Sequence, residues 1–336
     1  MRYVKNPPNP YLKYSAEFLG EPPPTRLEVF EETATRSMIS KSWSNAFGSR
    51  LTVNCYRGCI HACTYCFARQ YHEYLGYGAG TDFETRIVAK INAPEILREE
   101  LKRTRQKIKT LEFSFATDPY LPLEAGYQLT RKCLSVCREF RIPVSIITKS
   151  PLVTRDLDIL TKMKAQVFFS IPFLTTERSK PFELYTPTPD VRFRAMKTLA
   201  DAGITVGIGI APVILGYNEP DIPHLLEKAR ECGATKAFMS LIHFDTDSII
   251  EYFTEKLYEK IPTKADKILN AMRRERGGRL KHRNFDERNA GKSEQWQTAV
   301  KMFELHYKRL GFERSERTEK PAGEIQTPKI VQPRLF

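Results

Sequence analysis

Four of the seven cysteines of this chain lie within twelve positions, in the stretch VNCYRGCIHACTYCFAR (Val53–Arg69). Cys59, Cys63 and Cys66 have the spacing C-x3-C-x2-C, and Cys55 adds a fourth thiol. Thiolates bind zinc and iron–sulfur clusters. A metal site closed by four protein ligands is structural, whereas a site held by three keeps a position open for chemistry. The number of thiols that bind the metal therefore decides between a structural metal site and the metal site of an enzyme.

The spacing favours a cluster over a closed zinc site. A zinc site of the closed kind usually pairs two C-x2-C elements that are separated by a longer span, and here every ligand would come from one loop. Cys133, Cys137 and Cys232 lie in segments of helical period, where cysteines behave as small buried hydrophobes. Three thiolates on a tight loop suit a [4Fe–4S] cluster, whose fourth iron would then have no protein ligand.

Apolar segments alternate with segments of helical period along the middle of the chain, which predicts a parallel sheet with crossover helices. The expected strands are Arg50–Cys55, Thr110–Ala116, Pro143–Thr148, Ala165–Ile171, Ile204–Ala211 and Lys236–Ile242. The expected helices are Pro94–Arg105, Gln128–Phe140, Val191–Ala202 and Ile222–Cys232, followed by Ser248–Lys260, Lys264–Arg276 and Ser293–Leu310. We predict an α/β fold, a partial (βα)6 TIM-type barrel with a helical C-terminal extension. Chemistry in such folds lies at the C-terminal ends of the strands.

The chain divides into four expected parts. Residues 1–47 are rich in proline and are expected to be irregular, and residues 48–245 form the barrel. Residues 246–318 form a basic helical extension, and residues 319–336 are expected to be a disordered tail. No apolar run of about eighteen residues and no signal-peptide pattern occurs, so we expect a cytoplasmic protein without membrane contact.

The net charge of +13 predicts a polyanionic partner. Lys264–Phe336 holds 18 Lys and Arg against 10 Asp and Glu, so this last part alone contributes +8. The densest piece is MRRERGGRLKHRN, Met272–Asn284. A solvated helix end with no nucleic-acid role is an equally simple interpretation.

The C-x3-C-x2-C motif after the first strand, with an aromatic residue before its last cysteine, resembles the signature of the radical S-adenosylmethionine (SAM) superfamily. The resemblance implies that Cys59, Cys63 and Cys66 hold a [4Fe–4S] cluster whose fourth iron chelates SAM. It also implies a reductant such as flavodoxin or ferredoxin, and cleavage of SAM to a 5′-deoxyadenosyl radical. Cys55 stands where relatives have proline, so it is interpreted as a core residue at the strand end. His61 matches the family's histidine, as a hydrogen-bond donor or as loop filling.

Later motifs resemble the spore photoproduct lyase–like branch, described as DNA repair photolyase–like proteins. These motifs are FATDPYLPLE (115–124), ITKSPLVTRDLDIL (147–160), SIPF (170–173) and AGITVGIGIAPVILGYN (202–218). By position, the resemblance implies that Tyr65 contacts the adenine through its backbone and that Thr117 lies near SAM. It implies that Lys149 meets the methionine carboxylate and that Ser170 lies by the ribose or carboxylate.

One position departs from the spore lyase pattern. The lyase returns a hydrogen atom from a cysteine at the end of its second strand, and this chain has Ala116 there. A methyl group cannot donate a hydrogen atom as a thiol can, so the same lesion chemistry is not expected. Tyr120, or a cysteine from elsewhere in the fold, is the candidate substitute. Asp118 and Tyr120 are candidates for binding substrate or SAM, and Asp118 is equally a candidate N-cap or turn residue before Pro119.

Three functions follow as hypotheses. The first is a radical SAM enzyme that repairs or modifies DNA or RNA, with Trp43, Trp296 or a nearby tyrosine stacking on a base. The second keeps the radical chemistry and makes the substrate a protein, peptide or small molecule. The third is a non-catalytic iron–sulfur or zinc module that binds nucleic acid, and it requires four thiolate ligands including Cys55.

Overall fold

The structure is a computed structural model of the 336-residue chain. It describes residues 2–13, 18, 20–44, 48–104, 108–282 and 291–313, with the side chains of residues 42–44 and 48–49 excepted. The tail expected at residues 319–336 and the indole of Trp43 lie outside this description.

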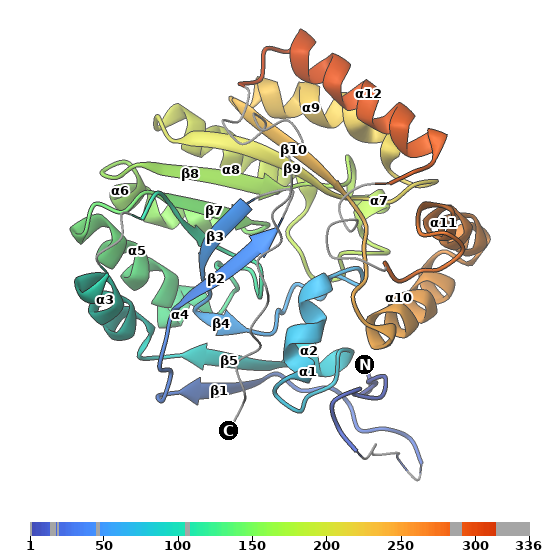
Figure 1. The fold of residues 1–336 in the computed structure, drawn as a ribbon, viewed down its shortest axis with the longest axis horizontal. Coiled ribbons are helices and arrows are strands. Elements are labelled where there is room, and N and C mark those ends of the chain that lie inside the picture. The colour runs from blue at the N-terminus through green and yellow to red at the C-terminus, as the bar shows by residue number, and fades with distance from the viewer. Residues whose placement is uncertain are drawn as a thin grey trace, which may run out of the picture.

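A seven-stranded sheet forms the centre of the molecule, in the order β10-β9-β8-β7-β6-β3-β2 (Figure 1). Six of its strands are parallel and follow one another in chain order, and each one matches an expected strand. They are β3 (Gly48–Val53), β6 (Leu111–Phe113), β7 (Val144–Thr148), β8 (Ala165–Ser170), β9 (Thr205–Val213) and β10 (Lys236–Leu241). The α/β fold with a partial (βα)6 barrel is therefore confirmed.

Helices cover the outer face of this sheet (Figure 1). Their apolar sides meet the strands in one core; on α5, for instance, Leu134 and Cys137 are fully buried. Each helix that the amphipathic pattern predicts forms at the expected place, so these predictions are confirmed. The helices between the strands are α3 (Ala93–Arg103), α5 (Leu129–Glu139), α6 (Leu157–Leu160), α8 (Pro189–Asp201) and α9 (Ile222–Glu231).

The N-terminal segment corrects the expectation of irregular structure over residues 1–47. Strand β1 (Glu28–Glu32) pairs in parallel with β5 (Arg86–Lys90), and β5 pairs with β4 (Tyr56–Arg57) in a small second sheet. Strand β2 (Ile39–Ser44) pairs antiparallel with β3 and adds an edge to the main sheet. Both N-terminal strands lie after the prolines, in runs that leave every backbone N–H available for a ladder.

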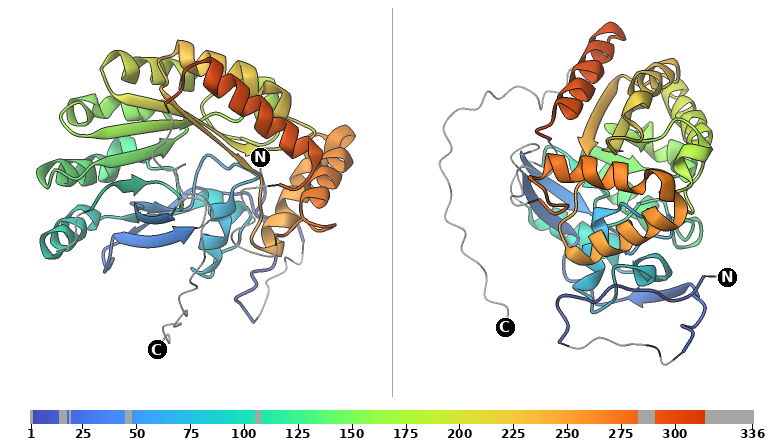
Figure 2. Two further views of the ribbon diagram at one scale, coloured as in Figure 1. Left: turned by 45° about the horizontal axis from the view of Figure 1, so that its top comes forward. Right: turned by 90° about the vertical axis from the view of Figure 1, so that its right-hand side faces the viewer.

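Three helices make the C-terminal extension, as expected. Helices α10 (Asp247–Lys260) and α11 (Pro262–Glu275) form an antiparallel pair beside the barrel, and α12 (Glu294–Arg309) lies along α9 (Figure 2). Ile249 and Phe253 of α10 pack in one apolar cluster with Phe173 and Phe182 of the barrel. The extension and the barrel thus share a core. No described helix is long and apolar enough to cross a membrane.

Short helical turns complete the connections between these elements. They are η1 (Phe67–Arg69), α1 (Gln70–Glu73), α2 (Thr81–Thr85), α4 (Glu124–Tyr127), η2 (Pro151–Asp156), α7 (Thr176–Ser179) and η3 (Glu219–Asp221).

Candidate active site

The loop that carries the three cysteines lies between β4 and η1, and backbone hydrogen bonds fix its course. Cys59 N donates to Phe83 O at 2.7 Å, and Thr64 N donates to Phe182 O at 2.8 Å. Gly58 has φ +79°, and a Cβ there would come within 2.9 Å of Phe83 O, so the turn into the loop requires glycine. We refer to residues 58–69 as the cluster loop.

The three cysteines of the cluster loop fit the cluster that the motif implies. All three are free thiols, and Cys59 and Cys63 are buried. Burial raises the pKa of Cys66 to about 11, and the charge of the neighbouring Cys59 adds to this shift. Among the described residues no group of ligands is arranged for a single metal ion. A cubane differs because each thiolate binds its own iron, and its positive irons would offset the repulsion between the sulfurs.

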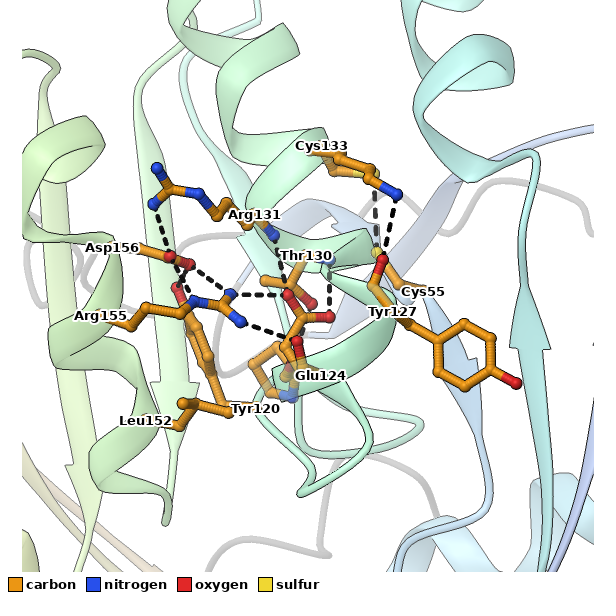
Figure 3. Close-up of polar contacts among 12 residues, drawn as sticks. Cys55, Tyr120, Glu124, Tyr127, Thr130, Arg131, Cys133, Leu152, Arg155 and Asp156 are labelled. Carbon is orange, nitrogen blue, oxygen red and sulfur yellow. Dashed lines mark hydrogen bonds and ion pairs between the residues drawn. The ribbon is translucent and has the colours of Figure 1, made fainter.

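Cys55 points away from the cluster loop into the core. Its sulfur lies 3.6 Å from the sulfur of Cys133 on α5, and both side chains are buried (Figure 3). Burial raises the pKa of Cys137 one turn further along the same helix, and Cys55 adds to that shift. This placement supports three thiol ligands rather than four.

Arg69 stabilises the cluster loop through hydrogen bonds to its backbone, and the sequence analysis did not predict this role. The side chain is fully buried, and its guanidinium donates to Cys63 O at 3.1 and 2.9 Å. It also donates to Ala79 O and Gly80 O at 2.8 Å and pairs with Glu84 at 2.6 Å. The signal in the sequence is an arginine three residues after the last cysteine, directly after Phe67 and Ala68.

The ends of β7 and β8 bring Lys149 and Ser170 together beside the cluster loop. Lys149 Nζ donates to Ser170 Oγ at 2.7 Å and lies 5.8 Å from the centre of the Tyr65 ring. It also lies 3.8 Å from the buried carboxylate of Glu183. The side chain of Lys149 is 14% exposed, and the prediction that it meets a ligand carboxylate stays a prediction.

Glu183 is a second site residue that sequence reasoning missed. Its carboxylate pairs with the fully buried Arg192 and accepts a hydrogen bond from the hydroxyl of Tyr65. Burial opposes its ionisation, but the charges of Arg192 and Lys149 lower the pKa of Glu183 below its usual value. Arg192 in turn donates to Ser170 O at 2.8 Å. Glu183 and Arg192 therefore connect the side chain of Tyr65 to the end of β8.

Thr117 and Asp118 tie the end of β6 to the cluster loop. Thr117 Oγ1 donates to Gly58 O at 2.5 Å. The Asp118 carboxylate accepts from Thr148 Oγ1 and Lys149 N, each at 2.7 Å, and lies 3.5 Å from His61 Nδ1. Burial lowers the pKa of His61, but the charge of Asp118, together with hydrogen bonding to Asp118 and to Cys59, outweighs burial and raises this pKa to about 9.

The turn interpretation of Asp118 agrees with its contacts. Its carboxylate also accepts from Tyr120 N at 2.9 Å, which is the pattern of a residue that stabilises its own turn. Its oxygens are thus occupied by groups of the protein itself. The placement supports a positioning role and does not support direct binding of a substrate.

Tyr120 lies in the core rather than at an open surface. The side chain is fully buried, and its hydroxyl donates to Asp156 at 3.1 Å (Figure 3). Arg155 and Arg131 pair with the same Asp156 at 2.8 Å. Burial and the charge of Asp156 raise the pKa of Tyr120 well above its usual value. This surrounding gives no support to Tyr120 as a hydrogen-atom donor.

The segment before Thr117, where the spore lyase pattern has a cysteine, is partly open. Ala116 is half-buried, and its N–H donates to Asn54 Oδ1 at 3.0 Å. Phe115 has φ +89°, a conformation that costs energy for a residue with a side chain and that often occurs at ligand sites. This segment therefore combines partial exposure with an unusual backbone conformation.

Comparisons with known proteins identify the family. The model of the radical SAM superfamily matches residues 53–229, which is more than half of the chain, so this chain belongs to that superfamily. An uncharacterized protein of Mycobacterium bovis (Mb2609c) is 35% identical over 222 residues, which cover 64% of this chain and 65% of that protein. An uncharacterized protein of Methanocaldococcus jannaschii (MJ0683) is 32% identical over 199 residues, covering 59% and 70%.

The fold is similar to that of spore photoproduct lyase. The lyase complexed with dinucleoside spore photoproduct matches with a TM-score of 0.60 over 84% of this chain and 79% of that chain, at 17% identity. This identity supports the fold and no more. Another lyase structure contains bound SAM and dinucleoside spore photoproduct.

Membership of the superfamily indicates the class of chemistry. The cofactors of this superfamily are a [4Fe–4S] cluster and SAM. Membership favours an enzyme over a non-catalytic metal module. This chain spans 65% of the length of the mycobacterial protein, which is less than two thirds, so its activity and its substrate are matters of proposal.

Proposed function

We propose that this radical SAM enzyme acts on nucleic acid, which it repairs or modifies. The observation that carries the proposal is the position of the basic segment Met272–His282. His282 Nε2 lies 2.9 Å from Asp245 at the end of β10, and Asp245 accepts from Gln70 Nε2 at 2.6 Å. Gln70 follows directly after the cluster loop. The most basic part of the chain is thus fastened to the end of the barrel where the cluster loop lies.

The charge of this segment suits a phosphate backbone. The described residues 272–282 contain five Lys and Arg and a single acidic residue, Glu275, which is buried. Arg273, Arg274 and Arg279 are exposed. Phosphate neutralisation by Lys and Arg supplies most of the affinity of a protein for nucleic acid that does not depend on sequence.

The similarity to spore photoproduct lyase lends further support, because that protein is seen with a dinucleoside lesion. Ala116 nevertheless stands where the lyase pattern has its hydrogen-donating cysteine. The proposal therefore concerns radical chemistry on nucleic acid and excludes the lyase's own route of hydrogen return.

The residues of this chain have distinct roles in the proposal. Cys59, Cys63 and Cys66 hold the cluster, while Lys149 and Ser170 bind the carboxylate and ribose of SAM. When bound, the cluster and SAM supply a 5′-deoxyadenosyl radical after reduction by an electron donor such as flavodoxin or ferredoxin.

Further contacts belong to the same proposal. The backbone of Tyr65 meets the adenine, and Thr117 lines the SAM site from the end of β6. Asp118 and Arg69 hold the loops that carry these groups, and the burial of the cysteines excludes water from the reaction.

Isotope transfer tests the substrate class. Reduced enzyme is incubated with SAM and with deuterated DNA, deuterated RNA or a deuterated protein extract, and 5′-deoxyadenosine is analysed for deuterium. We expect deuterium from nucleic acid. Deuterium from the protein extract alone, together with nucleic-acid binding that is absent or insensitive to salt, would overturn the proposal in favour of a protein or peptide substrate.

A further inference from the structure

A row of aromatic rings runs from the basic segment, past the end of the cluster loop, to the N-terminal segment. Consecutive rings contact one another with centroid distances between 4.7 and 6.5 Å. In order they are His282, His243, Phe67, Tyr71, Tyr74 and Tyr11, which we name the aromatic row. Phe67 directly follows the cluster ligand Cys66. The row therefore passes the cluster loop at Phe67.

The outer part of the aromatic row is open to solvent. Tyr71, Tyr74 and Tyr11 are 37%, 59% and 53% exposed. Tyr71 and Tyr74 lie at helix α1 and just after it, and the hydroxyl of Tyr11 donates to that of Tyr74 at 3.2 Å. Figure 1 shows α1 near the N-terminal segment. Large aromatic rings this exposed and this close together mark a binding surface.

The inner part of the aromatic row belongs to the basic segment, because His282 is the last residue of that segment. The side chain of its neighbour Lys281 is 43% exposed. Phe67 and His243 stack at 5.5 Å with an interplanar angle of 27°. Two features together bind unpaired nucleotides: cationic groups contact the phosphates, and aromatic rings stack on the bases. Stacking suits any sequence because every base has a face that can stack.

We propose that the aromatic row binds single-stranded nucleic acid by stacking on its unpaired bases, and so leads a nucleotide to the cluster loop. This inference rests on the proposed function and names the form of the substrate. A duplex keeps its bases stacked inside, so it offers only phosphates to the basic segment. Single-stranded DNA or RNA, or a duplex with an extruded base, can use the rings as well.

Binding of fluorescent oligonucleotides to the reconstituted enzyme tests the inference. Single-stranded DNA, single-stranded RNA and duplex DNA of equal length are compared for the wild type and for Tyr71→Ala/Tyr74→Ala. We expect single strands to bind more tightly than duplex, and the double variant to lose about tenfold or more in affinity for them. Because stacking involves no charge, the slope of log affinity against log salt should not change between about 50 and 200 mM.

Matched variants separate stacking from other effects. Tyr71→Phe/Tyr74→Phe keeps both rings and should restore binding, whereas Tyr258→Ala removes a 44% exposed tyrosine of α10 and should leave binding unchanged. Formation of 5′-deoxyadenosine without substrate should be equal in all variants, which also shows that they fold. If the Tyr71→Ala/Tyr74→Ala protein does not fold, Tyr74→Ala alone replaces it in the binding measurements.

The outcomes distinguish this inference from the proposed function. Equal binding by wild type and the alanine variants, or preference for duplex, contradicts the aromatic row and leaves a nucleic-acid substrate in place. Absence of binding to every oligonucleotide contradicts both.

Discussion

Asp118 shows how much of the site depends on a single buried carboxylate. It joins the ends of β6 and β7 to His61 of the cluster loop through contacts of 2.7 to 3.5 Å. An asparagine can accept hydrogen bonds through one oxygen only, and its amino group would face donors. We therefore expect Asp118→Asn to lower the free energy of unfolding at pH 7 by about 1–3 kcal/mol. Urea unfolding measures this.

A matched control for this substitution is Asp158→Asn. The side chain of Asp158 is 56% exposed and pairs with Arg131 at the surface. Its loss should change the free energy of unfolding by about 0.5 kcal/mol or less. An Asp118→Asn protein that is as stable as the Asp158→Asn protein would refute the role given to Asp118.

The same carboxylate predicts a dependence on pH. Burial would raise the pKa of Asp118, but the charge of His61 and hydrogen bonds from Lys149 and Thr148 lower it to about 2. Because the pKa lies below the ordinary value of about 3.9, its stabilising effect is present above pH 4. This effect is lost as the pH falls toward 2. The difference between wild type and Asp118→Asn should shrink over that range in a series of urea unfolding curves.

The cysteine ligands could be predicted from the sequence because all of them belong to one loop, and their spacing is a local property. Arg69, Glu183 and Arg192 could not, since their partners lie on other elements. An isolated arginine in a sequence is more often a surface residue. Only the fold shows that Arg69 and Arg192 are fully buried and paired.

Helix α10 holds the cluster loop through Tyr252. The hydroxyl of this buried tyrosine donates to Glu84 at 2.6 Å, and its ring lies 4.2 Å from the guanidinium of Arg69. Glu84 pairs with Arg69, and Arg69 holds the backbone of Cys63. The extension is thus linked to the cluster loop by a chain of direct contacts.

Removal of the Tyr252 hydroxyl tests this link. Tyr252→Phe removes one of the two donors to Oε1 of the buried Glu84 and leaves Arg69 as the other, so we expect a loss of about 1 kcal/mol in the free energy of unfolding. Iron should also leave the reconstituted protein faster during incubation with a chelator. Tyr258→Phe on the same helix, whose hydroxyl bonds to Asp266 at the surface, should change neither quantity. Equal behaviour of the two variants argues against a link from α10 to the cluster loop.

The expected strands and helices formed because their apolar periodicity matches the layers they occupy. The failures were β1, β2, β4 and β5. Strand β4 has two residues, and β1 is a half-exposed edge strand with charged residues, EVFEE, so neither has an apolar pattern to read. The partner of β1 also comes from a distant part of the chain, because Glu28–Glu32 pairs with Arg86–Lys90.

The charge of the molecule as a whole is uneven, and its basic segment predicts a measurable salt effect. Arg273→Gln/Arg274→Gln/Arg279→Gln removes three exposed charges near the end of the barrel. If each contacts a phosphate, the slope of log affinity for duplex DNA against log salt should fall by about 0.9 for each contact. Lys102→Gln/Lys197→Gln, which removes exposed charges on α3 and α8, should leave the slope unchanged. If the salt slope is the same for the wild type and for both sets of variants, the nucleic acid does not bind at the basic segment.

The central claim is that three thiols of the cluster loop hold the cluster and that Cys55 has no part in it. The direct measurement is the yield of 5′-deoxyadenosine from SAM and dithionite after anaerobic reconstitution. We predict 5′-deoxyadenosine from the wild type and from Cys55→Ala, and none from Cys63→Ala, which should also lack the brown colour of the cluster. Loss of the product in Cys55→Ala with its fold intact, or its continued formation in Cys63→Ala, would contradict the account.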